Sequence, residues 1–309
     1  MNCRVIDLFS GCGGLSLGFA REGFDVLGVD INPYTAEIFK INEIGETEIV
    51  DLSNKRNTFF AEKAFEVVLG GPPCKPWSTI NITKRGREHP DYFLMERFFE
   101  IVNCIKPTIF ILENVTASRK IVDAFVSQQT EYSIDIQHVR YSDWGAPTRR
   151  RRLFAVGIHE DAGVTAKDFF CILENFKMRA RTVRDAIFHL RNMPKNSEID
   201  HIYPELRTIK KYTEYYKSGK YGWYILKWDE PAPSFGNVMK TYILHPDSMN
   251  GVQPRVISVR EALCIMGFPE SFRFPSNMGM TMKYQMIADA VSPVFSTALA
   301  RTVKEVLIK

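Results

Sequence analysis

The 309-residue chain contains no apolar run that approaches the roughly 20 residues needed to cross a bilayer. Its N-terminus lacks the long apolar core of a signal peptide, and no internal repeat is visible. The six cysteines form no CxxC pair and no metal-ligand spacing, so we predict no metal site and reduced thiols in a cytoplasm. Apolar residues (45%) and charged residues (25%) occur in the proportions of a globular protein, which excludes disordered, collagen-like and coiled-coil chains.

Positive charge is concentrated in two places, although the formal net charge is only +4. Residues 205–228 carry six basic side chains against two acidic ones, together with seven Tyr or Trp residues. The second cluster is the run of four arginines at 149–152. Basic groups interleaved with flat rings suit a phosphate backbone and its bases. The alternative is a solvated face over a tyrosine-rich core.

Short β-branched runs alternate with helical patterns in the first half of the chain. The pattern predicts strands at 4–9, 25–30, 66–69, 108–112 and 153–158 and helices at 15–21, 34–42 and 93–104. Such alternation is typical of an α/β fold with a mostly parallel sheet and helices on both faces.

The pattern changes after about residue 185. Residues 191–256 are rich in Pro, Gly, Tyr and Lys, and we expect a small, irregular, mostly β and loop domain there. An S-x-x-E capping box at Ser258 predicts a helix toward Met266 that ends at Gly267. The last segment, 284–308, is expected to be helical with a break at Pro293.

A glycine loop follows the first predicted strand. Gly11 and Gly13 allow the backbone to approach a ligand closely, but the loop is neither GxGxxG nor a P-loop. Asp30 ends the next strand, where a carboxylate can bind both ribose hydroxyls, and Asp51 can reach an adenine amino group. These features predict a nucleoside-bearing cofactor at the carboxyl edge of the sheet. A plain tight turn, with Asp30 capping the next helix, is the alternative.

Two glycines and three prolines surround Cys74 in the stretch 70–78 at the exit of a strand. A rigid, partly exposed loop suits a nucleophile better than a structural thiol, and Lys75 or the arginines would favour the thiolate. Glu113 ends the adjacent predicted strand and is placed for proton transfer at the same edge. Helix capping is the alternative reading of Glu113.

Six motifs together resemble those of the DNA (cytosine-5)-methyltransferases. They are Phe9-x-Gly11-x-Gly13, Pro73-Cys74, Glu113-Asn114-Val115, Thr148-x-Arg150-x-Arg152, 255–268 and 285–293. They follow the family order and cover nearly the whole chain. There are three departures from the family pattern: Lys75 and Thr148 each replace a Gln, and Ala288-Asp289 replaces Gly-Asn. The departures bear on cofactor contacts and loop closure more than on the chemistry.

The resemblance implies transfer of a methyl group from S-adenosylmethionine to C5 of a cytosine that is flipped out of duplex DNA. Cys74 would be the nucleophile at C6, Glu113 would contact N3, Arg152 would hold O2, and Arg150 would order the site. The implied cofactor contacts are Phe9, Gly11, Cys12, Gly13, Asp30, Ile31, Asp51, Leu52, Gly71, Leu94, Asp289 and Ala290.

The resemblance also implies a Rossmann-like catalytic domain over 1–185 and 270–309, with a target-recognition domain over 186–269. Expected DNA contacts are Ser78, Lys210, Lys211, Tyr212, Lys240 and Thr241. We expect a monomer that acts on double-stranded DNA, with no membrane partner, as the modification enzyme of a restriction-modification system whose endonuclease need not touch it. Three alternatives stay open: an orphan enzyme, a catalytically silent DNA-binding relative, and the tRNA-methylating branch, whose Cys-Phe-Thr tripeptide is absent here.

Overall fold

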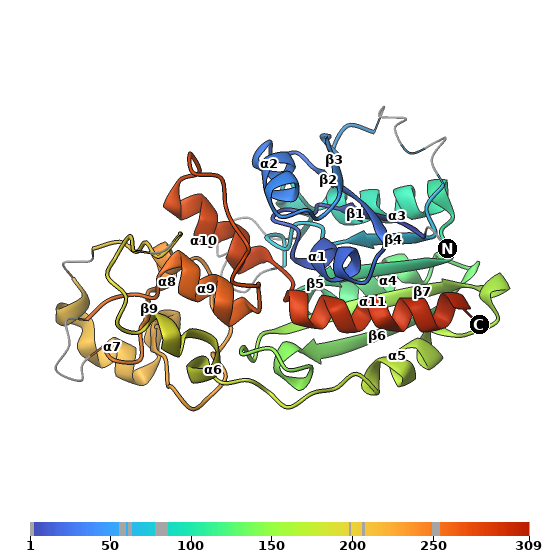
Figure 1. Ribbon diagram of the computed structural model, residues 1–309. Coiled ribbons are helices and arrows are strands. Elements are labelled where there is room, and N and C mark those ends of the chain that lie inside the picture. The colour runs from blue at the N-terminus through green and yellow to red at the C-terminus, as the bar shows by residue number, and fades with distance from the viewer. Residues whose placement is uncertain are drawn as a thin grey trace. The chain divides into compact units, whose positions relative to one another are not determined.

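A computed structural model of the chain describes residues 3–55, 60, 64–77, 86–197, 199–205, 208–248 and 254–308 (Figure 1). The chain divides into two compact units. Unit 1 comprises Met1–Arg140, Arg151–Lys177 and Ser296–Lys309, and unit 2 comprises Tyr141–Arg150 and Met178–Phe295. These bounds differ from the predicted functional division at 185/186 and 269/270, which stays a prediction. Among the described helices, none has the length and apolar character that a membrane span requires.

Unit 1 is built on a seven-stranded sheet in the order β3-β2-β1-β4-β5-β7-β6. The strands are β1 Arg4–Leu8, β2 Asp25–Asp30, β3 Glu46–Ile49, β4 Val67–Gly70, β5 Ile109–Asn114, β6 Tyr132–Arg140 and β7 Arg151–His159. All neighbours pair in parallel except β7, which runs antiparallel to both β5 and β6. The mostly parallel sheet is therefore confirmed. The edge strands β3 and β6 were not predicted, because an edge strand is only partly buried and carries more polar residues.

Helices cover both faces of this sheet. They are α1 Gly14–Arg21, α2 Tyr34–Ile41, α3 Phe93–Ile105, α4 Arg119–Val126, α5 Ala166–Glu174 and α11 Pro293–Ile308. Side chains of α3 and α4 pack with Ile6 and Leu8 of β1 in one apolar core. The alternate residue Asp7 meets Ser16 of α1 on the other face, where α11 lies beside α1 (Figure 1). The predicted layered α/β architecture is confirmed.

The parallel strands β1, β2, β4 and β5 end at the same edge of the sheet. Leu8 near the end of β1 pairs with Val29 of β2 and with Gly70 of β4, and Gly70 pairs with Leu112 of β5. The glycine loop, Asp30, the cysteine loop and Glu113 follow directly after these positions. Local strand register therefore brings four predicted functional segments to one edge, as is usual for ligand sites in α/β sheets.

Unit 2 contains short elements. They are α6 Val183–Ile187, α7 Thr213–Ser218, β8 Tyr224–Ile225, α8 Val238–Thr241, β9 Ile243–Leu244, α9 Val259–Met266 and α10 Met280–Asp289. The prediction of a β-rich segment needs correction, since the described strands there are the two-residue pair β8–β9 and short helical turns outnumber them. The tyrosines and tryptophans that favour strands by propensity instead pack on one another across these turns, so tertiary context outweighs propensity.

The predicted helix boundaries after residue 257 are close to the observed ones. Ser258 and Glu261 form the reciprocal capping box of α9, and Gly267 ends that helix in the left-handed region at φ 85°. Pro293 begins α11, so the predicted break is confirmed. Helix α10 starts at Met280, four residues before the predicted start.

Candidate active site

The glycine loop is fastened to the end of β2 by the Asp30 carboxylate. One carboxylate oxygen accepts the Gly11 amide at 2.8 Å and the other accepts the Asn32 amide at 2.8 Å. Gly11 (φ 54°) and Gly13 (φ 75°) both lie in the left-handed region, which explains the need for glycine. Helix α2 has no side-chain cap, so Asp30 does not play the alternative role of its N-cap. Asp30 instead shapes the loop.

The same edge has features that fit an adenosine group. Ile31, next to Asp30, is a large apolar side chain that is 64% exposed. A side chain built at Gly11 would meet no atom within 4 Å, so the loop borders open space. The buried Ser10 hydroxyl has no hydrogen-bond partner among the described residues. An exposed apolar surface beside a carboxylate that can bind ribose suits a nucleoside cofactor.

The remaining predicted cofactor residues are found in both units. Asp51 is exposed and accepts the Ser53 amide at 2.8 Å, just beyond β3. Cys12 and Leu52 are buried, and Phe9, Gly71 and Leu94 are partly exposed in unit 1. In unit 2, Asp289 is the exposed last residue of α10, and Ala290 is buried. Their contacts with a cofactor stay predictions.

Asp7 is a buried carboxyl group near this edge that the sequence analysis did not select. It is 1% exposed and accepts the Ser16 hydroxyl at 2.5 Å. Burial raises the pKa of Asp7 to about 7, and the negative charges of Asp30 and Glu113 add to that effect while Ser16 opposes it. The carboxyl groups at the ends of β1, β2 and β5 therefore influence one another electrostatically.

The cysteine loop lies against the end of β5. Asn114 donates its side-chain amide to the Pro72 carbonyl at 2.9 Å, and a Cβ added at Gly71 would lie 3.2 Å from Glu113 Oε2. Cys74 itself is half-buried, and its carbonyl accepts the Trp77 amide at 3.0 Å, which closes a turn. The loop and Glu113 are thus neighbours. Ser78 lies outside the described residues.

The other cysteines lack this setting. Cys3, Cys12 and Cys264 are buried, and burial raises the pKa of Cys3 to about 12 and that of Cys264 to about 11. Cys104 and Cys171 are exposed on the helices α3 and α5. Of the described cysteines, Cys74 is the half-buried one in a loop at the strand ends.

Glu113 and Arg152 form a buried ion pair. Arg152 Nε lies 3.0 Å from Glu113 Oε1, and the two side chains are 14% and 10% exposed. The pair forms because β5 and β7 are antiparallel neighbours, with Glu113 opposite Phe154 two residues after Arg152. Lys75, in contrast, is exposed at 3.9 Å from Asp91. The guanidinium and the carboxylate together present a donor and an acceptor at the edge where the cysteine loop ends.

Arg150 and Thr148 lie in unit 2, where their side chains donate hydrogen bonds to backbone carbonyls of segments far along the chain. The buried Arg150 guanidinium donates to the carbonyl of Phe235 at 3.2 Å and to that of Ala288. The Thr148 hydroxyl donates to the Ala232 carbonyl at 3.3 Å. These contacts fit the predicted ordering role of Arg150, and its part in the chemistry stays a prediction.

Two of the predicted DNA contacts, Lys240 and Thr241, directly precede Tyr242, which belongs to an aromatic cluster in unit 2. Trp223 stacks on Tyr216 (centroids 5.4 Å apart) and packs against Tyr242 at the same separation. Lys211 and Lys240 are exposed, and Thr241 is partly exposed beside Tyr242. The side chains of Lys210 and Tyr212 lie outside the described part of the chain. The rings therefore pack together as the alternative reading expects, and binding of DNA by the lysines stays a prediction.

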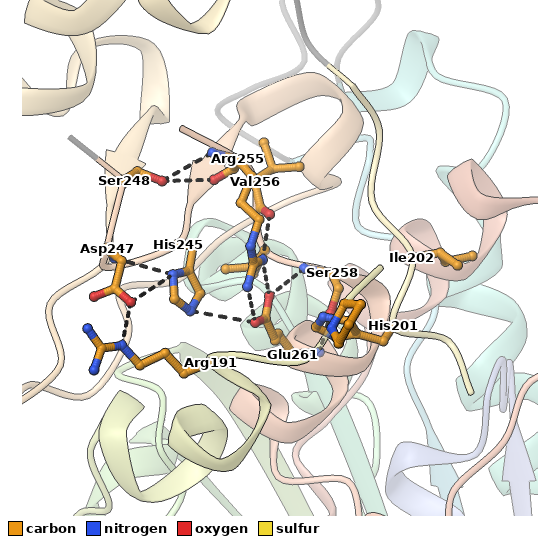
Figure 2. Close-up of polar contacts among 12 residues, drawn as sticks. Arg191, His201, Ile202, His245, Asp247, Ser248, Arg255, Val256, Ser258 and Glu261 are labelled. Carbon is orange, nitrogen blue, oxygen red and sulfur yellow. Dashed lines mark hydrogen bonds and ion pairs between the residues drawn. The ribbon is translucent and has the colours of Figure 1, made fainter. Parts of the chain in front are cut away.

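Unit 2 also contains a network of buried hydrogen bonds and ion pairs (Figure 2). Arg255 binds the fully buried Glu261 through two contacts of 2.7 Å, and His245 Nε2 lies 3.6 Å from the same carboxylate. Asp247 accepts from Arg191 at 2.6 Å and from the Trp228 indole at 3.0 Å. Burial lowers the pKa of His245 to about 4 although Glu261 opposes this shift, so the ring is neutral at pH 7. The network joins the chain after β9 to the start of α9.

Comparison with known proteins identifies the family. The protein-family model that describes the C-5 cytosine-specific DNA methylases matches residues 3–305 of this chain. The chain belongs to this family. The type II methyltransferase M1.HphI of Haemophilus parahaemolyticus is 28% identical over 338 residues, which cover 98% of this chain and 87% of that protein.

Two solved structures have folds similar to that of this chain. A prophage-encoded E. coli protein described as a DNA modification methyltransferase matches with a TM-score of 0.75 and 23% identity, covering 99% of this chain and 100% of that one. Spodoptera frugiperda DNMT2 matches with a TM-score of 0.72 and 15% identity, covering 99% and 100%. The protein is therefore a DNA (cytosine-5)-methyltransferase with the family and fold of S-adenosylmethionine-dependent enzymes.

Some residues of this methyltransferase were not selected from the sequence. Asn114 follows Glu113 directly, and this adjacency was the available signal for its contact with Pro72. Asp7 carried no signal, because its contact with Ser16 depends on how α1 packs back on β1. Asn237 carried none either, because its partner Thr281 lies in a distant segment.

Proposed function

We propose that the chain methylates C5 of a flipped-out cytosine in a short duplex sequence through a covalent bond between Cys74 and C6. The observation that carries this proposal is the buried Glu113–Arg152 pair beside the loop that bears Cys74. When bound, S-adenosylmethionine supplies the methyl group from its sulfonium. Every other part of the chemistry is assigned to side chains of this enzyme, except that a water molecule takes one proton.

The cytosine ring is a poor nucleophile at C5 because it is aromatic. Attack of the Cys74 thiolate on C6 forms an S–C6 bond and moves the ring electrons toward C5. Glu113, in its protonated form, gives its proton to N3 as negative charge develops there. Arg152 then donates hydrogen bonds to O2 and stays beside the carboxylate that Glu113 becomes. After methylation, the N3 proton returns to Glu113 and a water molecule takes the C5 proton. The electrons of the C5–H bond then re-form the C5–C6 double bond as the S–C6 bond breaks. The thiolate is recovered, and the 5-methylcytosine is released.

The exposed cations of unit 2 support binding to DNA. Lys211 and Lys240 are exposed, so their charges would bind phosphates, and Thr241 would contact a base edge. Such contacts predict an affinity that falls steeply as the salt concentration rises, because bound phosphates release counterions. An affinity that does not change with ionic strength would exclude this surface as the DNA contact.

A duplex that contains 5-fluorocytosine tests the covalent step, because fluorine at C5 cannot leave and the adduct accumulates. We expect a stable protein–DNA adduct in the wild-type enzyme and none in Cys74→Ser. Cys104→Ser is the matched control, since that thiol is exposed on α3 and should leave the adduct intact. An adduct that persists in Cys74→Ser would overturn the mechanism.

The relatives named type II methyltransferases support a role in restriction-modification. Bisulfite sequencing of DNA from a host that expresses the chain would give the methylated sequence. Protection of that site from an endonuclease encoded nearby would establish the pairing, and no contact between the two proteins is required. Incubation with labelled cofactor and either duplex DNA or tRNA separates the DNA enzyme from the tRNA-methylating alternative.

A further inference from the structure

Helix α8 carries two of the residues assigned to DNA, Lys240 and Thr241, yet it has only four residues. Helices this short do not persist through their own hydrogen bonds, because nucleation is unfavourable. Its conformation must therefore be imposed by contacts at its ends. The side chains at those ends determine where Lys240 and Thr241 are presented.

Asn237 fixes the first end. Its side-chain oxygen accepts the Met239 amide at 3.0 Å and so caps α8. Its side-chain nitrogen donates to the Thr281 carbonyl and to Gln285 Oε1, both at 3.1 Å in α10. Asn237 is only 5% exposed, so these three contacts satisfy a buried amide. One side chain therefore caps α8 and binds it to α10.

Gln285 extends this link to the end of α10. Its side-chain nitrogen donates to Asp289 Oδ2 at 2.8 Å, while its oxygen accepts from Asn237. An ionised carboxylate can only accept hydrogen bonds. Asp289 therefore turns the Gln285 amide nitrogen toward itself and the Gln285 oxygen toward Asn237. This agrees with the orientation that the Thr281 carbonyl and the Met239 amide give to Asn237. The two hydrogen bonds therefore run in one direction, with Asn237 donating to Gln285 and Gln285 donating to Asp289.

The other end of the segment is fixed as well. Tyr242 adopts a left-handed backbone (φ 30°) and packs on Trp223 with ring centroids 5.4 Å apart. Beyond β9, the His245 amide donates to the Arg255 carbonyl at 3.0 Å in the buried network of Figure 2. Residues 239–241 thus lie between two anchors, and Lys240 is exposed between them.

We propose that Asn237 and Gln285 are positioning residues for target recognition, and that they link the DNA-reading segment to the end of α10 where the resemblance places a cofactor contact. This inference rests on the proposed DNA methylation. It also assigns a role to Asp289, which stands where the family usually has Asn. The carboxylate can only accept from Gln285, so it supports the same direction of the amide chain that Thr281 and Met239 require of Asn237.

The test uses a pool of duplexes with randomised sequence around cytosine, methylated by the full-length enzyme and read by bisulfite sequencing. Asn237→Asp keeps the oxygen that caps α8 but removes both donor contacts, and Gln285→Met removes the amide. Gln285→Met is expected to reduce the ratio of preferred to single-mismatch methylation about tenfold, the cost of one buried hydrogen bond. Asn237→Asp, which loses two donor contacts, is expected to reduce it at least as much. The effect should fall on this ratio and on KM for DNA more than on kcat.

Restoring the link with reversed polarity is the decisive variant. In Asn237→Asp combined with Asp289→Asn, the Gln285 amide can turn, donate to residue 237 and accept from residue 289. We expect selectivity to recover toward the wild-type value relative to Asn237→Asp alone. Gln128→Met is the control, because Gln128 is exposed and donates only to a backbone carbonyl within its own turn. Selectivity unchanged in the single variants, or no recovery in the double variant, overturns the proposal.

Failure of the proposed function would look different. A wild-type chain that methylates no duplex in the pool overturns DNA methylation itself. A wild-type chain that methylates, alongside Gln285→Met with unchanged selectivity, overturns only the positioning role. If Asn237→Asp melts early, Gln285→Met carries the test alone, since it leaves the cap of α8 intact.

Discussion

Arg152 binds Glu113 at 3.0 Å across the antiparallel pair β5–β7, and both side chains are nearly buried. Because the sheet is parallel elsewhere, this one reversed strand brings an arginine from a distant motif to the end of β5. A guanidinium so placed neutralises the carboxylate before a substrate arrives. Arg152 Nη1 donates to the Arg151 carbonyl at 2.8 Å, so Nη2 is the nitrogen that we assign to the proposed contact with a pyrimidine oxygen.

Arg152→Met should abolish most methylation and also destabilise the fold. Removing one partner of a buried pair leaves the other charge uncompensated, at a cost of about 3–5 kcal/mol. Urea unfolding of Arg152→Met, Glu113→Gln and the double variant measures this cost. The double variant should lose clearly less than the sum of the singles. Arg151→Met, at the exposed neighbouring position, should change stability by no more than about 0.5 kcal/mol.

Asp7 should make the fold less stable as the pH rises from acid to neutral. Its pKa is raised from 3.8 to about 7, so the folded state holds a proton that the unfolded state releases between these values. The stabilisation is complete below about pH 4 and is lost through pH 7, on the order of a few kcal/mol. Asp7→Asn removes the titration, so wild type should lose stability relative to this variant over that range. Asp161→Asn, at a side chain 94% exposed, should follow the wild-type curve.

Gly18→Ala should destabilise the enzyme although alanine normally favours a helix by about 1 kcal/mol. A Cβ at Gly18 would overlap backbone atoms of Ser296 and Thr297 in α11. We expect a loss of about 1–3 kcal/mol, as for overpacking in a core. Gly279→Ala is the matched control, because a Cβ there meets nothing within 4 Å and its φ of −66° is ordinary. Equal melting temperatures for the two variants would contradict the close packing of α1 on α11.

Glu261→Gln should lower the free energy of unfolding by about 3–5 kcal/mol, since it leaves the Arg255 guanidinium without its buried counter-charge. Burial favours the protonated acid, but the hydrogen bonds and charge of Arg255 outweigh it and lower the pKa of Glu261. Its stabilisation is therefore present at neutral pH and lost as the pH falls through the acid range, opposite in sign to that of Asp7. Unfolding curves across that range measure it. Glu270→Gln, with a side chain 79% exposed, should have little effect.

Strand patterns predicted much of the active-site edge. The apolar runs that became β1, β2, β4 and β5 were visible in the sequence, and parallel strands place their carboxyl ends together. Asp30, Cys74 and Glu113 follow such runs, so their approach to one edge could be expected. The edge strand β6 was missed because only one of its sides pairs, and its residues are largely half-buried.

The segment around residues 205–228 could not be predicted in the same way. Its tyrosines and lysines are compatible with strands, helical turns or loops, and their observed conformation depends on the stacking of Tyr216, Trp223 and Tyr242. These rings are separated by up to 26 positions along the chain. Local propensity carries no information about such contacts.

The sequence by itself determined the family and the α/β layers and led to the proposal for Cys74, because all three depend on residue type, spacing and the period of apolar positions. The tertiary structure decided that Arg152 meets Glu113, that Asp7 is buried, and that Asn237 reaches Gln285. Each of these contacts joins residues that no local pattern relates. Their geometry follows from strand order and helix packing, which are established only when the whole chain has folded.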